Sequence, residues 1–497
     1  MRSIIKILLF KTITVLVFVM FHGGYSFGEE PEIASVEIAQ APEKKGPDRK
    51  SDLSRNINID MKVLYGQYNN MLSTINLSQE QNDFVYLLSA NFKRSNDFGY
   101  NSVTYENSSY YENKLGFTGN LQITEKWRTI LETEVHGDSR GMFDNTVYSR
   151  EEKEKSKVSL KNVVKLSTAF EGYVTVGGAQ YVHRLRPLVD TSDGNSRLNQ
   201  ANSEIGGEYI WSPTNRIRFN SMFYYYDYSV EDVPSDRSLN SEIIDDFYIT
   251  RNIGISLGVN VDWNRDDDFL VSPILSFLVK DYRFATIGVA YRYDQIPFRP
   301  ENYYLEQKYI MPAYDLPPAR VHHGHLQMEF RMNSFLNIKS LFTVEKSNNY
   351  YNYYPVSGNV LSADTLQVVN YRSKINVSLF FLERMFEYEM SYEYSYFDAD
   401  YNVTYHPIHQ FSGAVKYNGE QWKITWLNRF QGQVYTDPYD ERQLGGFVVG
   451  ELGIQRKMLE SFFAYIKIEN LYNRKYFMRE GYPEQGFSFM GGIRILI

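Results

Sequence analysis

The feature that most constrains this chain is an alternation of apolar and polar side chains, which begins at Ile57 and continues to the last residue, Ile497. It comes in segments of about ten residues separated by turn residues. In the segment 253–263, bulky apolar side chains alternate with Gly, Ser, Asn and Asp; in 386–396, aromatic rings and a methionine alternate mainly with Glu and Ser. Successive side chains of a strand point to opposite faces, so each segment predicts a strand with one apolar and one polar face.

The chemistry of the two faces separates two all-β folds. A soluble sandwich packs its inner face with aliphatic side chains and keeps its outer face polar. Here the polar face carries long charged groups, and the chain is rich in Tyr (42) and Phe (32), which crowd the ends of the segments. Such aromatic girdles belong at membrane interfaces, with lipid outside and water in the lumen. The pattern therefore predicts an all-β fold, a transmembrane antiparallel β-barrel.

The number of alternating segments predicts about 22 strands; the alternation is weak in the second, 70–78. Short connections such as 251–252 alternate with long ones such as 139–155, 294–320 and 349–364. Short periplasmic turns and long extracellular loops are typical of outer-membrane barrels. The bare apolar final strand is expected to pair with the first, because lipid does not tolerate unpaired strand edges.

The N-terminus differs from the rest of the chain in its residue pattern. Arg2 and Lys6 precede the apolar run 12–21, and a glycine at position 28 follows it, which is the pattern of a secretory signal peptide over residues 1–28. An uncleaved membrane anchor is the alternative. No later run is long and apolar enough to predict a transmembrane helix.

Residues 29–56 are polar and charged, and we expect them to form a flexible periplasmic segment before a barrel over 57–497. The chain has a formal net charge of −8 and becomes more acidic when its basic leader is removed, which disfavours nucleic acid as a partner. It contains no cysteine, which excludes disulfides, thiolate metal sites and cysteine nucleophiles.

Two stretches carry a resemblance to a known family. The stretch 65–102 contains Tyr65, Gly66, Tyr68, Tyr86, Leu88, Ser89, Ala90, Ser95 and Tyr100. The stretch 468–493 contains Asn470, Leu471, Tyr476, Gly481, Tyr482, Pro483, Gly486, Ser488 and Phe489. They resemble the opening and closing strands of the TonB-dependent receptors of bacterial outer membranes, whose barrels have 22 strands. The chain departs from that pattern at its last residue, Ile497, where the family usually has an aromatic side chain.

The resemblance implies an outer-membrane transport barrel, but family members hold a folded plug domain inside the barrel. Only 29–56 separate the expected cleavage site from the first strand, so we expect a barrel without its own plug. Its lumen would be roughly 45 Å across. A separate plug-like protein, inward-folded loops or a client would have to fill it. The proline-rich connection 294–320 is either such an inward constriction or a surface loop.

Several candidate site residues are expected to face the lumen. They are His323, His325, Gln327, Glu329 and Arg331 near the outer mouth, and the acidic row Glu387, Glu389 and Glu393. Two imidazoles two residues apart can help to hold a metal or an anionic ligand. The alternative is ordinary lumen polarity. In the stretch 31–41, Val36, Ile38 and Ala39 resemble the core of a TonB box, which pairs as an added strand with a TonB-type energy transducer; the alternative is a plain linker.

The sequence thus predicts a barrel in the bacterial outer membrane, in contact with its lipid, that moves a solute with a separately supplied plug or partner. A plug-free pore or export conduit gated by its own loops is the first alternative. A surface receptor or adhesin that uses the aromatic stretch 348–359 is the second. We see no hydrolase motif and predict no enzymatic activity, cofactor or metal.

Overall fold

The computed structural model describes residues 56–81, 83–101, 103–188, 194–229, 233, 235–264, 268–281, 284–296, 308–311, 316–332, 334–356 and 360–497. The expected leader, nearly all of the periplasmic segment and the TonB-box-like residues therefore lie outside the described residues.

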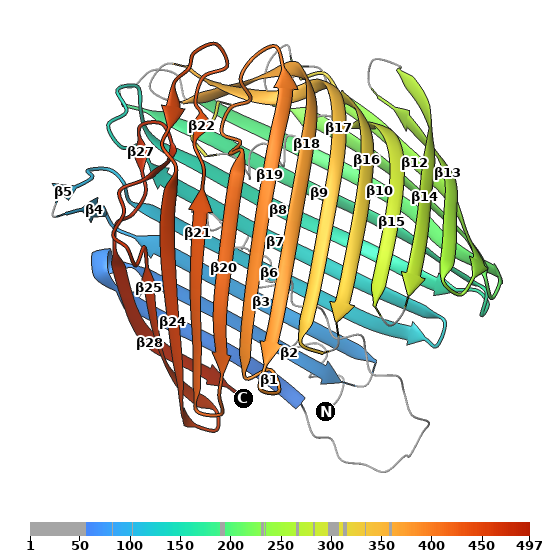
Figure 1. Cartoon of the computed structure of the whole chain (residues 1–497), viewed down its shortest axis with the longest axis horizontal. Helices are drawn as coiled ribbons and strands as arrows, with labels where there is room; N and C mark the ends of the chain where they lie inside the picture. The colour runs from blue at the N-terminus through green and yellow to red at the C-terminus, as the bar shows by residue number, and fades with distance from the viewer. Residues whose placement is uncertain are drawn as a thin grey trace.

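The described chain forms one closed antiparallel sheet of 22 strands, in which each strand pairs with the next along the chain (Figure 1). The first eleven are β1 (Asn56–Gly66), β2 (Met71–Gln81), β3 (Phe84–Ser95), β6 (Tyr110–Thr124), β7 (Trp127–Gly141), β8 (Tyr148–Lys165), β9 (Phe170–Pro187), β10 (Gly194–Ser212), β11 (Asn215–Tyr228), β12 (Asp236–Thr250) and β13 (Ile253–Trp263). The others are β14 (Phe269–Asp281), β15 (Ala285–Ile296), β16 (Ala319–Met332), β17 (Leu336–Pro355), β18 (Leu361–Phe381), β19 (Phe386–Ala399), β20 (His409–Asn418), β21 (Trp422–Gln431), β24 (Phe447–Leu459), β25 (Phe462–Glu469) and β28 (Ser488–Leu496).

Several smaller elements lie on the connections between the barrel strands. A 3-10 turn, η1 (Gln67–Asn69), follows β1. Three two-stranded hairpins lie on connections: β4 (Gly99–Tyr100) with β5 (Val103–Thr104), β22 (Val434–Tyr435) with β23 (Gln443–Leu444), and β26 (Phe477–Arg479) with β27 (Tyr482–Pro483). No helix in the described parts of the chain has the length and apolarity needed to cross a membrane.

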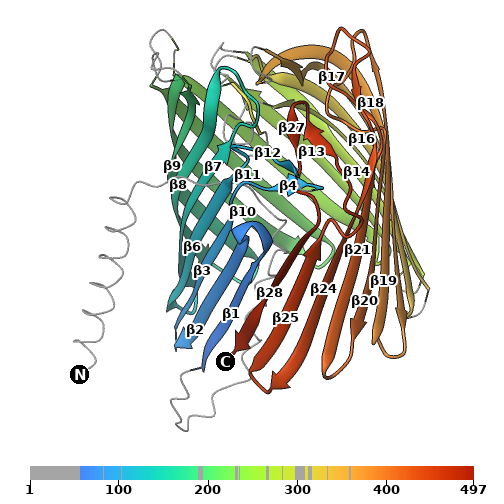
Figure 2. The ribbon, with the colours of Figure 1, turned by 90° about the vertical axis from the view of Figure 1, so that its left-hand side faces the viewer.

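The final strand closes the barrel, as the sequence predicts. β28 pairs with β1 from Asp60↔Leu496 to Gly66↔Met490, and the two strands lie side by side in Figure 2. Backbone hydrogen bonds of 2.8 and 2.9 Å join Ile59 and Ile497. On the lumen side, the Arg494 guanidinium donates to both carboxylate oxygens of Asp60, at 2.9 and 2.8 Å.

The predicted alternation of faces is also confirmed. In β13, Leu257 and Val259 are each 46% exposed on the lipid side, whereas Asn260 and Asp262 point to the lumen and are buried. Cross-strand ion pairs lie on the polar face, for example Lys374 with Glu393 at 3.3 Å. The barrel therefore has an apolar outer surface and a polar inner wall, which is the arrangement of an outer-membrane barrel.

The predicted strand count is correct, including the weak second strand, but several predicted connections are too long. β8 begins at Tyr148 rather than near 156, and β18 begins at Leu361 rather than near 365. These strands run past the apolar band, and no regular alternation of apolar and polar residues marks their outer ends. Most of the predicted loops 139–155 and 349–364 is therefore strand.

Candidate functional site at the outer mouth

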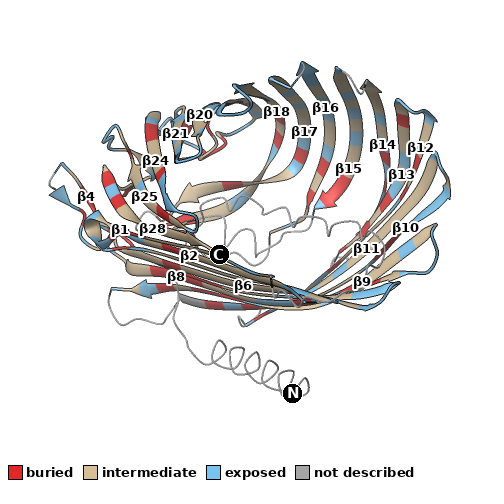
Figure 3. Cartoon of the chain, turned by 90° about the horizontal axis from the view of Figure 1, so that it is seen from below, coloured by how far each residue is buried: buried red, intermediate tan, exposed pale blue. Residues whose placement is uncertain are grey.

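The extended ends of β17 and β18 bend over the outer mouth (Figure 1). We call their residues 350–356 and 360–366 the lid hairpin. The pairing register of the two strands shifts between Ser347 and Tyr350, where the hairpin leaves the wall. Seen from below, β8 and β9 lie on one side of the ring and β17 and β18 on the other (Figure 3). Contacts between the lid hairpin and β9 therefore cross the mouth.

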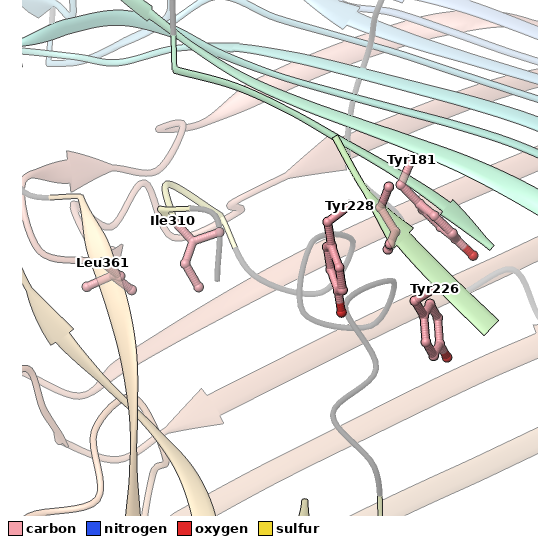
Figure 4. Packing of buried hydrophobic residues seen from close by; sticks show 6 residues of the cluster. Tyr181, Tyr226, Tyr228, Ile310 and Leu361 are labelled. Carbon is pink, nitrogen blue, oxygen red and sulfur yellow. The ribbon is translucent and has the colours of Figure 1, made fainter. Parts of the chain in front are cut away.

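Such contacts form a buried apolar cluster (Figure 4). Its members come from β9, β10 and β11 on one side and from the 308–311 segment and β18 on the other: Tyr181, Leu198, Tyr226, Tyr228, Ile310 and Leu361. Ile310 is fully buried and Leu361 is 2% exposed. Burying one such side chain contributes about 1.5–3 kcal/mol, so this cluster holds the lid hairpin firmly against the opposite wall.

A second buried cluster adjoins the first. It contains Met142 from the β7–β8 connection, Leu185 of β9, Val360 of the lid hairpin and Tyr482 of β27. The ring of Tyr309 stacks on that of Tyr482, with the ring centres 3.6 Å apart and the planes 5° from parallel. Burial raises the pKa of both phenols, so both are neutral at physiological pH. The two clusters thus bring together residues of four connections, those between β7 and β8, β15 and β16, β17 and β18, and β25 and β28.

A buried carboxylate fixes the 308–311 segment to the wall. Glu151 of β8 is fully buried and accepts hydrogen bonds from the backbone N–H groups of Tyr309, at 2.8 Å, and Ile310, at 3.1 Å. The same carboxylate contacts Lys153 Nζ at 3.2 Å and His183 Nε2 at 3.1 Å. Four partners around one buried carboxylate make a strong, directional anchor, because charge-assisted hydrogen bonds are about twice as strong as neutral ones.

The 308–311 segment in turn holds the lid hairpin. Leu361 N–H donates to the Tyr309 carbonyl at 2.8 Å, and Met311 N–H donates to the Leu361 carbonyl at 2.7 Å. Residues 308–311 belong to the connection 294–320. From the sequence, this connection is either an inward constriction or a surface loop. Residues 308–311 lie inside the mouth; residues 297–307 and 312–315 lie outside the described residues.

The other side of the lid hairpin contacts the connection between β19 and β20. Thr404 N–H donates to Asn352 Oδ1 at 2.9 Å, and Tyr353 N–H donates to Thr404 Oγ1 at 3.1 Å. The Arg479 guanidinium lies 4.4 Å over the Tyr405 ring. The tyrosines of 348–359 that the structure describes are therefore packed within the mouth rather than displayed on a free loop.

His406, in the connection between β19 and β20, makes the packing of this connection dependent on pH. Burial lowers the pKa of His406 from 6.5 to about 4, with further contributions from Arg479 and Arg372. His406 Nε2 also lies 3.2 Å from the Tyr350 hydroxyl of the lid hairpin. When the β19–β20 connection is detached from the mouth, His406 has its ordinary pKa of 6.5 and binds a proton more readily than in the packed connection. The packing of this connection is therefore fully stable above pH 6.5. Between pH 6.5 and 4 its stability decreases as the pH falls, by up to ~3 kcal/mol.

We expect amide hydrogen exchange of residues 401–407 to accelerate between pH 7 and 4.5, after correction for the intrinsic rate. His406→Gln, which keeps a neutral polar side chain, should remove this pH dependence. Unchanged corrected protection in the parent chain would contradict the assignment.

The predicted histidine row lies on one face of β16, below the mouth. His323 Nδ1 contacts Glu345 Oε1 at 3.1 Å, and Glu329 contacts Arg331 at 3.0 Å and Lys339 at 3.7 Å. His325 and Gln327 are exposed on the same face. Among the residues that the structure describes, no group of three or more His, Cys, Asp and Glu side chains could hold a metal ion. The row remains a candidate lining of the lumen.

The predicted acidic row lies on β19, where neighbouring strands supply its partners. Lys416 of β20 lies 3.8 Å from Glu387 and 2.7 Å from Glu389, and Glu393 lies 3.4 Å from Arg372 and 3.3 Å from Lys374. The row is therefore compensated locally by cations on the adjacent strands.

Sequence reasoning missed Glu151, Ile310 and Leu361 as site residues. Glu151 lies in a uniformly charged stretch that predicts a loop, and its partners Tyr309 and Ile310 are more than 150 residues away along the chain. Nothing in the local pattern marks such a contact. Tyr482 alone stood out, because it is part of the closing motif that carries the family resemblance.

Comparison with known proteins supports the fold. No protein-family model and no curated protein sequence matches this chain. Among solved structures, it is similar to the siderophore receptor PirA from Acinetobacter baumannii, with 10% identity, a TM-score of 0.70, and coverage of 90% of this chain and 81% of that one. It is also similar to the copper transporter OprC, with 11% identity, a TM-score of 0.72 and coverage of 91% and 84%.

A third similar structure is the FrpB iron transporter from Neisseria meningitidis, with 10% identity, a TM-score of 0.72 and coverage of 90% and 82%. At these identities the likeness concerns the fold. The chain has the 22-strand outer-membrane barrel fold of the TonB-dependent receptors, which confirms the fold expected from the two resembling stretches.

Proposed function

We propose that this chain is an outer-membrane transport barrel that passes a solute through its lumen and is closed at the outer mouth by its own lid hairpin. The observation that carries the proposal is the buried cluster in which Leu361 and Ile310 pack on Tyr181 and Leu198 of the opposite wall. A surface receptor would need no apolar seal across its lumen. A conduit with a polar lumen does need one, because a wide open pore would let cell contents escape.

A specific class of solute is a further proposal. PirA is described as a siderophore receptor, OprC as a copper transporter and FrpB as an iron transporter. Their shared barrel fold supports a transport role here and leaves the solute open.

A separately supplied plug or a TonB-type energy transducer belongs to the same proposal. It rests on the family resemblance, and the region 31–41 would contact the transducer. Co-purification from detergent-solubilised outer membrane tests this part. A barrel that is isolated alone from cross-linked cells would contradict it.

Conductance in planar bilayers tests the lid hairpin. We expect the parent barrel to be nearly closed, and replacement of residues 350–366 by a short Gly-Ser turn to raise the single-channel conductance at least tenfold. The matched control replaces the short turn 419–421 at the periplasmic end and should leave the conductance low. A folded variant that stays closed without its hairpin would contradict gating by the lid.

The second candidate is an export conduit with no partner, gated by the lid hairpin alone. The anchoring of the lid from both sides of the mouth favours it, because such a seal works without a plug. The same recordings discriminate the two. If the lid-deleted barrel has a large, stable conductance, and purified outer-membrane extract does not reduce it, the result favours the conduit.

A further inference from the structure

A pocket of about 400 Å³ lies in the lumen wall beside the seam that closes the barrel. Its walls come from strands on both sides of that seam, including β1, β21, β25 and β28. It extends to Asn418 and Lys423, which pair next to a short turn and so mark the periplasmic end of the lumen. The pocket is therefore far from the lid hairpin and independent of it.

The charges around this pocket do not balance. Asp60 is its one acidic residue among the described lining, and both of its carboxylate oxygens are occupied by Arg494. The Lys62 ammonium lies over an aromatic face, with its Nζ 3.9 Å from the centre of the Tyr465 ring. No carboxylate of the described residues lies within ion-pair distance of Lys62 or Lys423. Two positive charges are thus left uncompensated.

A neutral donor faces the same space. Gln455 is 6% exposed, and its Oε1 accepts a hydrogen bond from Arg494 Nη1 at 3.3 Å. This fixes the orientation of the amide, since its oxygen is engaged, and leaves its NH2 group without a protein acceptor in the described part of the chain. An anion in the pocket could accept a hydrogen bond from this NH2 group.

A glycine shapes the floor of the pocket. A Cβ at Gly453 would lie 2.9 Å from the Tyr465 hydroxyl oxygen, so only glycine lets this ring lie close against the wall. The ring in turn supports the Lys62 ammonium by a cation–π contact. The lysine is therefore held over the pocket without a carboxylate that would neutralise it.

This pocket differs from the acidic row on β19. On β19, each glutamate of the acidic row has a cation on a neighbouring strand. Unpaired charges of one sign in a lumen raise the local concentration of solutes of the other sign. Small anions fit the pocket in both size and charge.

We propose that the pocket lined by Lys62, Lys423 and Gln455 binds a phosphate or carboxylate group, and that the transported solute is anionic. The second part rests on the proposed transport function; the binding of an anion does not. Lys62 and Lys423 supply the charge, and the Gln455 amide supplies a fixed donor.

Phosphorus NMR of inorganic phosphate with the purified full-length barrel, at low ionic strength in a neutral detergent, tests the site. We expect the barrel to broaden the phosphate resonance, and K62Q/K423Q to weaken binding at least tenfold. Displacement of phosphate by citrate would show that carboxylates share the site, and resistance to citrate would restrict it to phosphate. Thr425→Glu, which adds a carboxylate to the intact pocket, should cause the same loss as the double variant.

The matched control is K157Q/K165Q. Both of these β8 lysines face the lumen away from the seam and have no described carboxylate partner, and the control should bind phosphate like the parent. Heat-modifiable migration on gels verifies that each variant is folded. No broadening by the parent, or an equal loss in the control, would overturn the site. Conductance of the lid-deleted barrel is measured separately, so a failed transport function would leave this result standing.

Discussion

Replacing Glu151 with alanine is expected to release the 308–311 segment and open the outer mouth. The substitution removes the acceptor of two backbone N–H groups and leaves Lys153 and His183 without their carboxylate. Loss of one partner from a buried ion pair costs about 3–5 kcal/mol, equivalent to at least a hundredfold shift from closed to open. The barrel wall itself should persist, because its ladders of backbone hydrogen bonds do not depend on this side chain.

Two measurements check this result. Amide exchange of Tyr309 and Ile310 should accelerate by about two orders of magnitude, and single-channel recordings should show frequent openings. Glu151→Gln retains a neutral acceptor and should have an intermediate effect. The control is Glu154→Ala on the same strand, whose side chain pairs with Arg184 at 2.8 Å on the outer face. Undiminished protection of Tyr309 and Ile310 in the alanine variant would show that the apolar clusters alone hold the segment.

The second large effect concerns closure of the barrel, which we expect Gly492→Val to prevent. Gly492 pairs with Leu64 across the seam, and a Cβ at this position would overlap the carbonyl oxygen of Val63. This neighbour is backbone, so it cannot move aside without breaking the pairing of β28 with β1. An unclosed barrel exposes two strand edges, and lipid offers no hydrogen bonds to satisfy them.

Gly491→Val is the matched control for this substitution. A Cβ at Gly491 would meet only the Phe489 ring, at 4.0 Å, because it points to the lipid side. We expect the Gly491 variant to refold into detergent with the heat-modifiable migration of the parent, and the Gly492 variant to yield almost no folded band. Equal folding of both variants would show that the two terminal strands approach less closely than the structure indicates.

The local pattern of the sequence determined the barrel. The period of two between apolar and polar side chains is imposed by the strand itself, so the alternation in 253–263 was enough to predict β13 and both of its faces. The same reasoning predicted the 22 strands and the closure through the final strand, because lipid forbids any open edge. Only the outer strand ends were missed, since no alternation of apolar and polar residues continues into those extensions.

Tertiary structure alone decided what happens at the mouth and at the seam. Glu151 and Tyr309, or Leu361 and Tyr181, meet because the ring brings opposite walls under one hairpin. Lys62 becomes an uncompensated charge only because Arg494, from the other end of the chain, occupies Asp60. Periodicity reports which face a residue takes on its own strand; it contains no information on which distant segment that face will meet.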